Sequence, residues 1–325
     1  DVIDHARERI WLTTFILSGE VKAQLIVKLT AAHQRGVDVR LLVDRAGSGL
    51  LHFNAAAIKA YNALPFPVAL YHHRRFRAFI FMEKRLHSKI VIADAVAFLG
   101  AHNLRDEVMP GHQNYVRNLS LKFAGEVVES LSELFAALWS DNKNEPLEVV
   151  AARPINGELK RVTGVPARII YTDPLTRDHR YNQYLQALFF AARQRIYIWM
   201  PYMIPTQVMR SNLIMAHYAG VDVKVLMPKT TDSPLVDNAH QLVLNELVDA
   251  GVPCVVSTGN TTAGVCESKF DHSKILIVDD VSIIGSTNLD YRSLYRNHET
   301  NIEVADPAVT QSMVQLFEAR YHAGQ

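Results

Sequence analysis

The hydrophobic pattern of the first part of the chain alternates between short β-type runs and helical periods. Apolar and β-branched runs at residues 9–16 and 37–43 predict two strands. Between them, apolar residues recur at helical spacing over 21–32, after an N-cap at Ser18 and before Gly36. A strand, a helix and a strand in succession predict a parallel sheet with right-handed crossovers.

The same alternation continues to the end of the chain and predicts an α/β protein. Further helices are expected at residues 54–63, 126–139, 182–192, 208–219, 238–250 and 307–321. Further strands are expected at residues 68–71, 116–123, 167–171, 195–200, 221–227, 253–256 and 301–304.

A predicted buried hairpin carries the most distinctive polar residues. Within residues 270–293, His272 and Lys274 are two residues apart, so both side chains leave the same face of an extended strand. Two apolar runs follow, separated by an Asp279–Asp280 turn, and the second ends just before Asn288. An imidazole, an ammonium and an amide suit a phosphate oxyanion and suit a transition metal poorly.

The same arrangement occurs earlier in the chain. His87, Lys89, Asp94 and Asn103 have the spacing of His272, Lys274, Asp279 and Asn288. The match extends further: residues 6–10 align with 192–196 at an offset of 186, and 36–40 align with 220–224 at an offset of 184. The offset at the two histidines is 185. Offsets this constant indicate a tandem duplication.

The duplicated HxKxxxxD pattern resembles that of the phospholipase D superfamily. Residues 285–299, GSTNLDYRSLYRNHE, are similar to its cardiolipin-synthase-like branch, as are residues 41–48 and 200–205. The resemblance covers nearly the whole chain. It implies two tandem α/β/α domains related by a pseudo-twofold axis, with the active site at their interface.

Length and composition agree with two copies of one domain. The chain has 325 residues, of which 49% are hydrophobic and 21% are charged. We expect domains at residues 1–145 and 166–325, joined by a polar linker at 146–165. Only five residues precede the repeat in the first copy, against about 25 in the second, so we expect the first domain to lack its opening strand.

The repeated polar residues supply chemistry for cleaving a phosphodiester. One histidine can attack phosphorus while the other protonates the leaving oxygen. The lysines and asparagines can hold the non-bridging oxygens. The resemblance implies a phosphohistidine intermediate and no metal or other cofactor. The predicted catalytic residues are His87, Lys89, Asn103, His272, Lys274 and Asn288.

The resemblance also implies an acidic residue that orients each imidazole. Glu299 fits this role for His272. The corresponding position for His87 is Asn118, where an aspartate is usual, and an amide stabilises an imidazolium less than a carboxylate does. Family precedent and the nearby basic segment favour His87 as the nucleophile, whereas a carboxylate at His272 favours the reverse. Asp94 and Asp279 are expected to be structural, because both follow buried strands at turns.

A basic and aromatic segment at residues 72–85 leads directly into His87. We interpret it either as a cationic lip for anionic headgroups or as a solvated loop whose phenylalanines fold back onto the core. The candidate substrate-binding residues are Arg74, Arg75, Arg77, Arg85 and Ser286.

The expected substrate is a phospholipid such as phosphatidylglycerol, with an alcohol or water as acceptor, so both phosphatidyl transfer and hydrolysis are open. A metal-independent nuclease of the same superfamily is the alternative, disfavoured by a net charge of only +1. A catalytically impaired lipid-binding module is the third hypothesis, motivated by Asn118.

The expected location is at a membrane surface, cytoplasmic or exported. No apolar run approaches the roughly 18 residues of a membrane span. The sequence starts at Asp1 and not at Met, which raises the alternative that a leader or anchor precedes it. Cys254 and Cys266 have no metal-binding spacing; we favour two inert thiols over a disulfide, which would indicate an oxidising compartment.

Overall fold

The computed structural model describes residues 2–49, 54–71, 84–143, 145–150, 164–176, 179–257 and 270–324. The chain divides into two compact units. Unit 1 comprises Asp1–Asp106 with Ser120–Thr163, and unit 2 comprises Glu107–Leu119 with Gly164–Gln325. Both are α/β, as the sequence predicts. The division differs from the expected one at Glu107–Leu119, which belongs to the second unit and not to the first.

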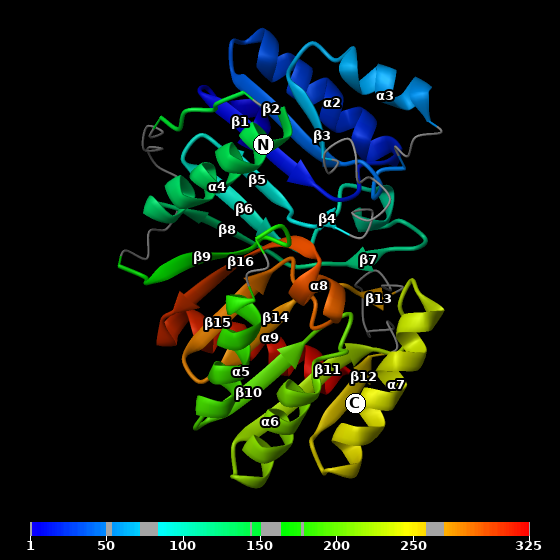
Figure 1. Cartoon of the computed structure of the whole chain (residues 1–325), viewed down its shortest axis with the longest axis vertical. Helices are drawn as coiled ribbons and strands as arrows, with labels where there is room; N and C mark the ends of the chain where they lie inside the picture. The colour runs from blue at the N-terminus through cyan, green and yellow to red at the C-terminus, as the bar shows by residue number, and fades with distance from the viewer. Residues whose placement is uncertain are drawn as a thin grey trace. The chain divides into compact units, whose positions relative to one another are not determined.

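Unit 1 is built on a six-stranded sheet in the order β3-β2-β1-β5-β6-β8 (Figure 1). The strands β1, β2 and β3 are parallel, and β5, β6 and β8 continue antiparallel. The elements are α1 (Val2–His5), β1 (Arg9–Thr14), α2 (Gly19–Gln34), β2 (Asp38–Asp44), α3 (Ala55–Asn62), β3 (Val68–Tyr71), β4 (Arg85–Leu86), β5 (Ile90–Ala93), β6 (Val96–Gly100), β8 (Ser120–Ala124) and α4 (Glu126–Lys143).

Helices cover both faces of this sheet because successive strand residues point to opposite sides. Ile10 joins the core that includes Leu29 of α2. The next residue, Trp11, stacks on Phe135 of α4 with ring centroids 5.2 Å apart. The unit is therefore a three-layer α/β/α structure, with α2 on one face and α4 on the other.

Unit 2 repeats this plan with strand order β12-β11-β10-β14-β15-β16. Ile196 joins the core with Leu213 of α6, and the next residue, Tyr197, stacks on Phe317 of α9 at 4.8 Å. The elements are β9 (Ala167–Thr172), α5 (Arg180–Ala191), β10 (Arg195–Trp199), α6 (Gln207–Tyr218), β11 (Asp222–Pro228), α7 (Pro234–Asp249), β12 (Cys254–Ser257), β13 (Phe270–Asp271), β14 (Ile275–Val278), β15 (Val281–Gly285), α8 (Tyr291–Tyr295), β16 (Asn297–Ala305) and α9 (Pro307–Ala323).

The two sheets match strand for strand except at one edge. In unit 2, β9 pairs antiparallel with β16. In the described part of unit 1, no strand occupies the equivalent place beside β8. Across the described ranges, no helix is both long and apolar enough to cross a membrane.

The predicted strand at 116–123 is wrong as a single element. Two separate strands occupy this range, β7 (Val116–Arg117) and β8. A short 3₁₀ helix, Asp106–Val108, precedes β7. Whereas β8 pairs with β6 in unit 1, β7 pairs in parallel with β13 in unit 2. The strand-like pattern continues through residues 116–123, but the chain passes from the β7–β13 pair to the sheet of unit 1 between Arg117 and Ser120.

Candidate active site

The repeated hairpins bring the histidine, lysine and asparagine of each copy to one sheet edge. His87 and Lys89 immediately precede β5, and His272 and Lys274 immediately precede β14. Each asparagine lies three residues beyond the end of the partner strand, β6 or β15. Because the partner strands are antiparallel, the start of one and the end of the next share an edge.

In unit 1 this set is His87, Lys89 and Asn103, which we call half-site 1. All three side chains are buried. The ammonium of Lys89 donates a hydrogen bond to the His87 carbonyl oxygen at 2.5 Å. Phe15 lies edge-on to the His87 ring, with centroids 5.1 Å apart, and the Lys89 ammonium is 5.6 Å from the same phenyl ring. The aromatic wall restricts the orientation of the imidazole.

In unit 2 the set is His272, Lys274 and Asn288, which we call half-site 2. These side chains are also buried. Lys274 Nζ lies 3.1 Å from Nε2 and 3.3 Å from Nδ1 of His272. It also donates to the His272 carbonyl oxygen at 3.1 Å, as its counterpart does in half-site 1. In half-site 2 the ammonium thus lies beside the imidazole, and in both half-sites the lysine ammonium hydrogen-bonds to the carbonyl oxygen of the histidine. A cation and an imidazole together suit an anionic phosphate.

The two asparagines share one feature. The Oδ1 atoms of Asn103 and Asn288 are both buried, and neither accepts a hydrogen bond from the described residues. Buried amides that serve only packing are nearly always satisfied. Unused hydrogen-bonding capacity at equivalent positions of two copies indicates groups held for a ligand.

Asn118 fixes the tautomer of His272. Its Nδ2 donates to the Val116 carbonyl at 2.9 Å, which leaves Oδ1 facing His272 Nδ1 at 3.0 Å. An amide oxygen can only accept, so Nδ1 carries the hydrogen. In the neutral ring, Nε2 then holds the lone pair and is the atom available for proton transfer or attack.

This contact corrects the assignment of Asn118 to His87. The segment that carries Asn118 belongs to unit 2, where β7 pairs in parallel with β13. The backbone amide of His272 donates to the Arg117 carbonyl at 2.7 Å, which brings the next residue, Asn118, against the His272 ring. Equal spacing in two copies cannot reveal that Asn118 contacts His272 and not the histidine of its own repeat, because this contact depends on which strand β7 pairs with.

Glu299 lies in β16 and is fully buried. Its carboxylate accepts hydrogen bonds from Ser286 Oγ at 2.5 Å and from Asn297 Nδ2 at 3.1 Å. The position at His272 Nδ1 that Glu299 was expected to fill is occupied by Asn118.

Ser286, expected to bind substrate, is also fully buried. Its hydroxyl donates to Glu299 and accepts from the Thr300 amide at 3.0 Å. The Ser286 hydroxyl therefore links the Glu299 carboxylate to the backbone of β16.

The two motif aspartates make equivalent contacts in the two units. Asp94 accepts hydrogen bonds from the backbone amides of residues 7–9, and Asp279 accepts from those of residues 193–195, at distances of 2.7–3.3 Å. Both have positive φ, 51° and 50°, a region that aspartate tolerates better than most residues. Each carboxylate thus ties the hairpin turn to the start of the central strand, β1 or β10.

Asp44, a buried aspartate near His87, was missed in the sequence. It accepts hydrogen bonds from the amides of Ala46, Gly47 and Leu86, and Leu86 directly precedes His87. Burial raises the pKa of Asp44 to about 6. The sequence signal that could have identified Asp44 is its place as an acidic residue at the end of the apolar strand β2.

Asp271, which directly precedes His272, was missed as well. It is buried and lies 4.0 Å from Arg117 and 3.6 Å from Arg320. Burial raises the pKa of Asp271. Its two arginine neighbours come from distant parts of the chain, so spacing gave no signal for this cluster.

Of the four arginines predicted to bind substrate, one lies among the described residues. Arg85 is half-buried in β4, whereas Arg74, Arg75 and Arg77 lie outside the described residues. Within the described ranges, no group of three or more metal-ligating side chains is close enough to hold an ion.

Of the two cysteines, Cys266 lies outside the described residues. Cys254 is a free thiol whose pKa is raised by burial to about 12, so it stays protonated and unreactive at neutral pH.

The duplicated three-layer fold with a His–Lys–Asn set at equivalent sheet edges defines a protein of the phospholipase D class. The family described as "Cardiolipin synthase, PLD-like domain" matches residues 1–139 and 185–321. The chain belongs to this family, which confirms the predicted superfamily and branch.

Curated relatives agree with the family match. The minor cardiolipin synthase ClsB of Bacillus subtilis is 32% identical over 323 residues, covering 97% of this chain and 76% of the relative. Cardiolipin synthase A of Pseudomonas entomophila is 30% identical, covering 98% of this chain and 64% of the relative. Cardiolipin synthase 1 of Staphylococcus epidermidis is 28% identical, covering 94% and 61%. The predicted enzyme class, a phospholipase D-type phosphatidyltransferase, is the class of these relatives.

Solved structures support the fold. The phosphatidylserine synthase of Haemophilus influenzae superimposes with a TM-score of 0.68 at 17% identity, covering the whole of this chain and 82% of that one. The polyphosphate kinase of Porphyromonas gingivalis superimposes with a TM-score of 0.59 at 14% identity, covering 98% of this chain and 43% of that one. At these identities the likeness concerns the fold alone, and it confirms the predicted tandem α/β architecture.

Proposed function

We propose that the chain cleaves phospholipid phosphodiesters and transfers the phosphatidyl group to an alcohol, as a cardiolipin-synthase-like transferase. The observation that carries the proposal is the duplicated set of a buried histidine, lysine and asparagine at the same sheet edge, with the lysine ammonium hydrogen-bonded to the histidine carbonyl in both copies. Phosphatidylglycerol is the proposed substrate because the curated relatives are named as cardiolipin synthases.

The proposed reaction has two steps. In the first, one histidine attacks phosphorus and forms an N–P bond, while the other donates a proton to the oxygen of the leaving alcohol. In the second, the deprotonated histidine removes a proton from the acceptor alcohol, whose oxygen attacks phosphorus and releases the first histidine. Lys89 and Lys274 neutralise charge on the non-bridging oxygens. Water as the acceptor gives hydrolysis by the same steps.

We assign His87 as the nucleophile and His272 as the general acid. His272 has an uncharged amide at Nδ1, and the ammonium of Lys274 lies 3.1 Å from Nε2. The amide stabilises an imidazolium less than a carboxylate would, and the ammonium opposes it by like-charge repulsion, so protonated His272 gives up its proton readily to a leaving oxygen.

The test is to incubate the protein with labelled phosphatidylglycerol, with phosphatidylcholine and ethanol, and with single-stranded DNA. We expect phosphatidyl transfer to an alcohol from the lipid substrates, and a phosphohistidine trapped on the peptide that contains His87. Cleavage of DNA without turnover of lipid would establish the nuclease instead. Lipid binding without turnover of any substrate would establish the impaired lipid-binding module.

A further inference from the structure

Helices α5 and α6 pack on each other in unit 2 (Figure 1). Together they expose four large apolar side chains. Phe190 at the end of α5 is 70% exposed. On α6, Val208, Met215 and Tyr218 are 52%, 57% and 72% exposed. Their spacing of seven and three residues places them along one side of the helix. We call Phe190, Val208, Met215 and Tyr218 the α5–α6 face.

The duplication supplies an internal control for this face. In unit 1, α2 follows the first central strand as α6 does in unit 2, and both cover the sheet in the same way. Val27 is the one large apolar side chain that α2 exposes, and the helix carries charged residues such as Glu20 and Lys28. The shared fold therefore does not require apolar residues on the outside of α6.

A hollow lies between the two helices. It has a volume of about 210 Å³ and is lined mainly by apolar side chains, among them Phe189, Phe190, Met215 and Ala216. The lining includes one charged residue, Arg193, which is exposed just beyond the end of α5. An apolar hollow with a cationic neighbour suits an amphiphilic ligand whose apolar part is a chain and whose head is anionic.

Charge on the face points to the same kind of partner. Neither α5 nor α6 contains an aspartate or glutamate, and α6 is preceded and followed by uncharged turns. The acids at the neighbouring sheet edge already have partners: Asp279 accepts from backbone amides, and Asp222 pairs with Lys224 at 3.1 Å.

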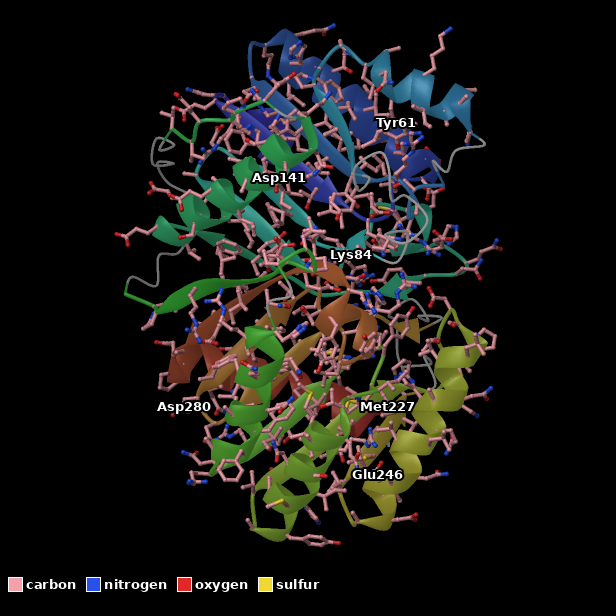
Figure 2. The ribbon with its side chains drawn as sticks, viewed as in Figure 1. Tyr61, Lys84, Asp141, Met227, Glu246 and Asp280 are labelled. Atoms are coloured by element: carbon pink, nitrogen blue, oxygen red, sulfur yellow. The ribbon has the colours of Figure 1, made fainter. Side chains whose placement is uncertain are left out.

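The outer helix α7 differs in this respect. It carries three acidic residues, Asp237, Glu246 and Asp249 (Glu246 is labelled in Figure 2). Glu246 pairs with Arg210 of α6 at 2.6 Å, so Asp237 and Asp249 are the carboxylates of α7 that an anionic surface would repel. This makes α7 the contrast to the α5–α6 face.

We propose that the α5–α6 face docks on the surface of an anionic lipid bilayer, with Phe190, Met215 and Tyr218 inserted among the acyl chains and Arg193 at the level of the phosphates. The choice of a bilayer rests on the proposed function, since a lipid substrate must be taken from a membrane. Aromatic and aliphatic side chains with arginine on an interfacial helix are the combination that such docking uses.

The test compares two double variants that remove similar apolar area. Phe190→Ser with Met215→Ser removes the centre of the α5–α6 face, and Leu235→Ser with Leu242→Ser is the matched control on α7, where both leucines are exposed. Binding to phosphatidylglycerol vesicles is measured by sedimentation. We expect the first pair to weaken binding at least tenfold, because each apolar side chain that leaves water contributes about a factor of ten or more, and the control pair to bind like the unaltered protein.

Insertion is measured separately with a tryptophan reporter. The three natural tryptophans, Trp11, Trp139 and Trp199, are buried, so Tyr218→Trp adds one exposed reporter. We expect its emission to shift to the blue on vesicles and to be quenched by brominated lipids, whereas Leu235→Trp on α7 should show neither change.

Three outcomes of the vesicle experiment would overturn the proposal: equal binding by both double variants, equal loss in both, or no binding by the unaltered protein. A change from dimer to monomer in the first double variant, with no change in vesicle binding, would overturn it too. That result would assign the α5–α6 face to a second copy of the chain.

Failure of this proposal is distinguishable from failure of the proposed function. Turnover of bis(p-nitrophenyl) phosphate, a soluble phosphodiester, needs no bilayer and should be the same in the first double variant as in the unaltered protein. If the protein binds vesicles through this face but cleaves neither the soluble nor the lipid diester, the function is wrong and the docking surface stands.

Discussion

At the residue scale, the contact between Asn118 and His272 determines which ring nitrogen carries the hydrogen. An amide, and not a carboxylate, contacts Nδ1, and its orientation is fixed by the bond from Nδ2 to the Val116 carbonyl. The tautomer is therefore maintained without a negative charge. The protonated ring is less stable beside this amide than it would be beside a carboxylate, which favours release of the proton by His272.

Asn118→Asp and Asn118→Leu separate orientation from charge. If His272 is the general acid, a carboxylate at position 118 should move the alkaline limb of the kcat profile to higher pH, because it stabilises the imidazolium. Leucine removes the hydrogen bond, so kcat should fall by about 10- to 100-fold, as for other residues that orient a reacting group. The measurement is kcat against pH on a soluble diester. Two unchanged profiles would mean that Asn118 does not orient His272.

Asp44 predicts a pH dependence of stability. Its pKa is 3.8 in the unfolded chain and about 6 when folded, so the folded protein holds more protons between these values. The contribution of Asp44 to the free energy of unfolding is therefore greatest below about pH 4. It decreases by about 3 kcal/mol as the pH rises to about 6. Asp44→Asn should remove this part of the slope. Urea unfolding at several pH values measures it, and an unaltered slope in the variant would contradict the prediction.

At the element scale, the turn between β14 and β15 depends on Asp279. Its carboxylate accepts hydrogen bonds from amides at the start of β10, and its φ of 50° is one that few other side chains adopt easily. The equivalent turn in unit 1 depends on Asp94 in the same way. These matching contacts explain the aspartate of each motif without a catalytic role.

Asp279→Ala should destabilise the protein by about 2–4 kcal/mol, from the lost hydrogen bonds and the strained backbone. Asp279→Gly is the matched control, because it loses the same bonds but tolerates positive φ, so it should cost about 1 kcal/mol less. Chemical unfolding measures both, and kcat per folded molecule should stay unchanged. A large fall in kcat with unchanged stability would instead assign Asp279 to the chemistry.

At the scale of the whole molecule, the duplication means that each unit carries half of the proposed catalytic set. The chain cannot form a complete set from one unit, because each has a single histidine of the motif. We expect His87→Ala and His272→Ala each to lower kcat by at least roughly a thousandfold, as the loss of a nucleophile or its acid–base partner does in other covalent mechanisms.

Mixing the two single variants tests whether both half-sites of one chain act together. If they do, the mixture should be as inactive as either variant alone. Recovery of activity on mixing, measured with the same diester, would show that half-sites from two chains combine.

Chelation tests the chemistry of the whole site. Two imidazoles and two ammonium groups can supply the proton transfer and charge neutralisation that a metal supplies in other phosphodiesterases. Activity should therefore persist, within about twofold, after treatment with EDTA. Complete loss that a single divalent ion restores would contradict the proposed mechanism.

The duplication, the α/β class and the polar residues of both half-sites can be predicted from the sequence. These follow from local rules: strand periodicity places His272 and Lys274 on one side, and an antiparallel hairpin returns Asn288 to the same edge. The partners of these residues depend on the tertiary structure. The pairing of β7 with β13 moves Asn118 to His272, and burial makes Asp44 part of the surroundings of His87. Such contacts depend on segments far apart in the chain, which spacing within one repeat does not encode.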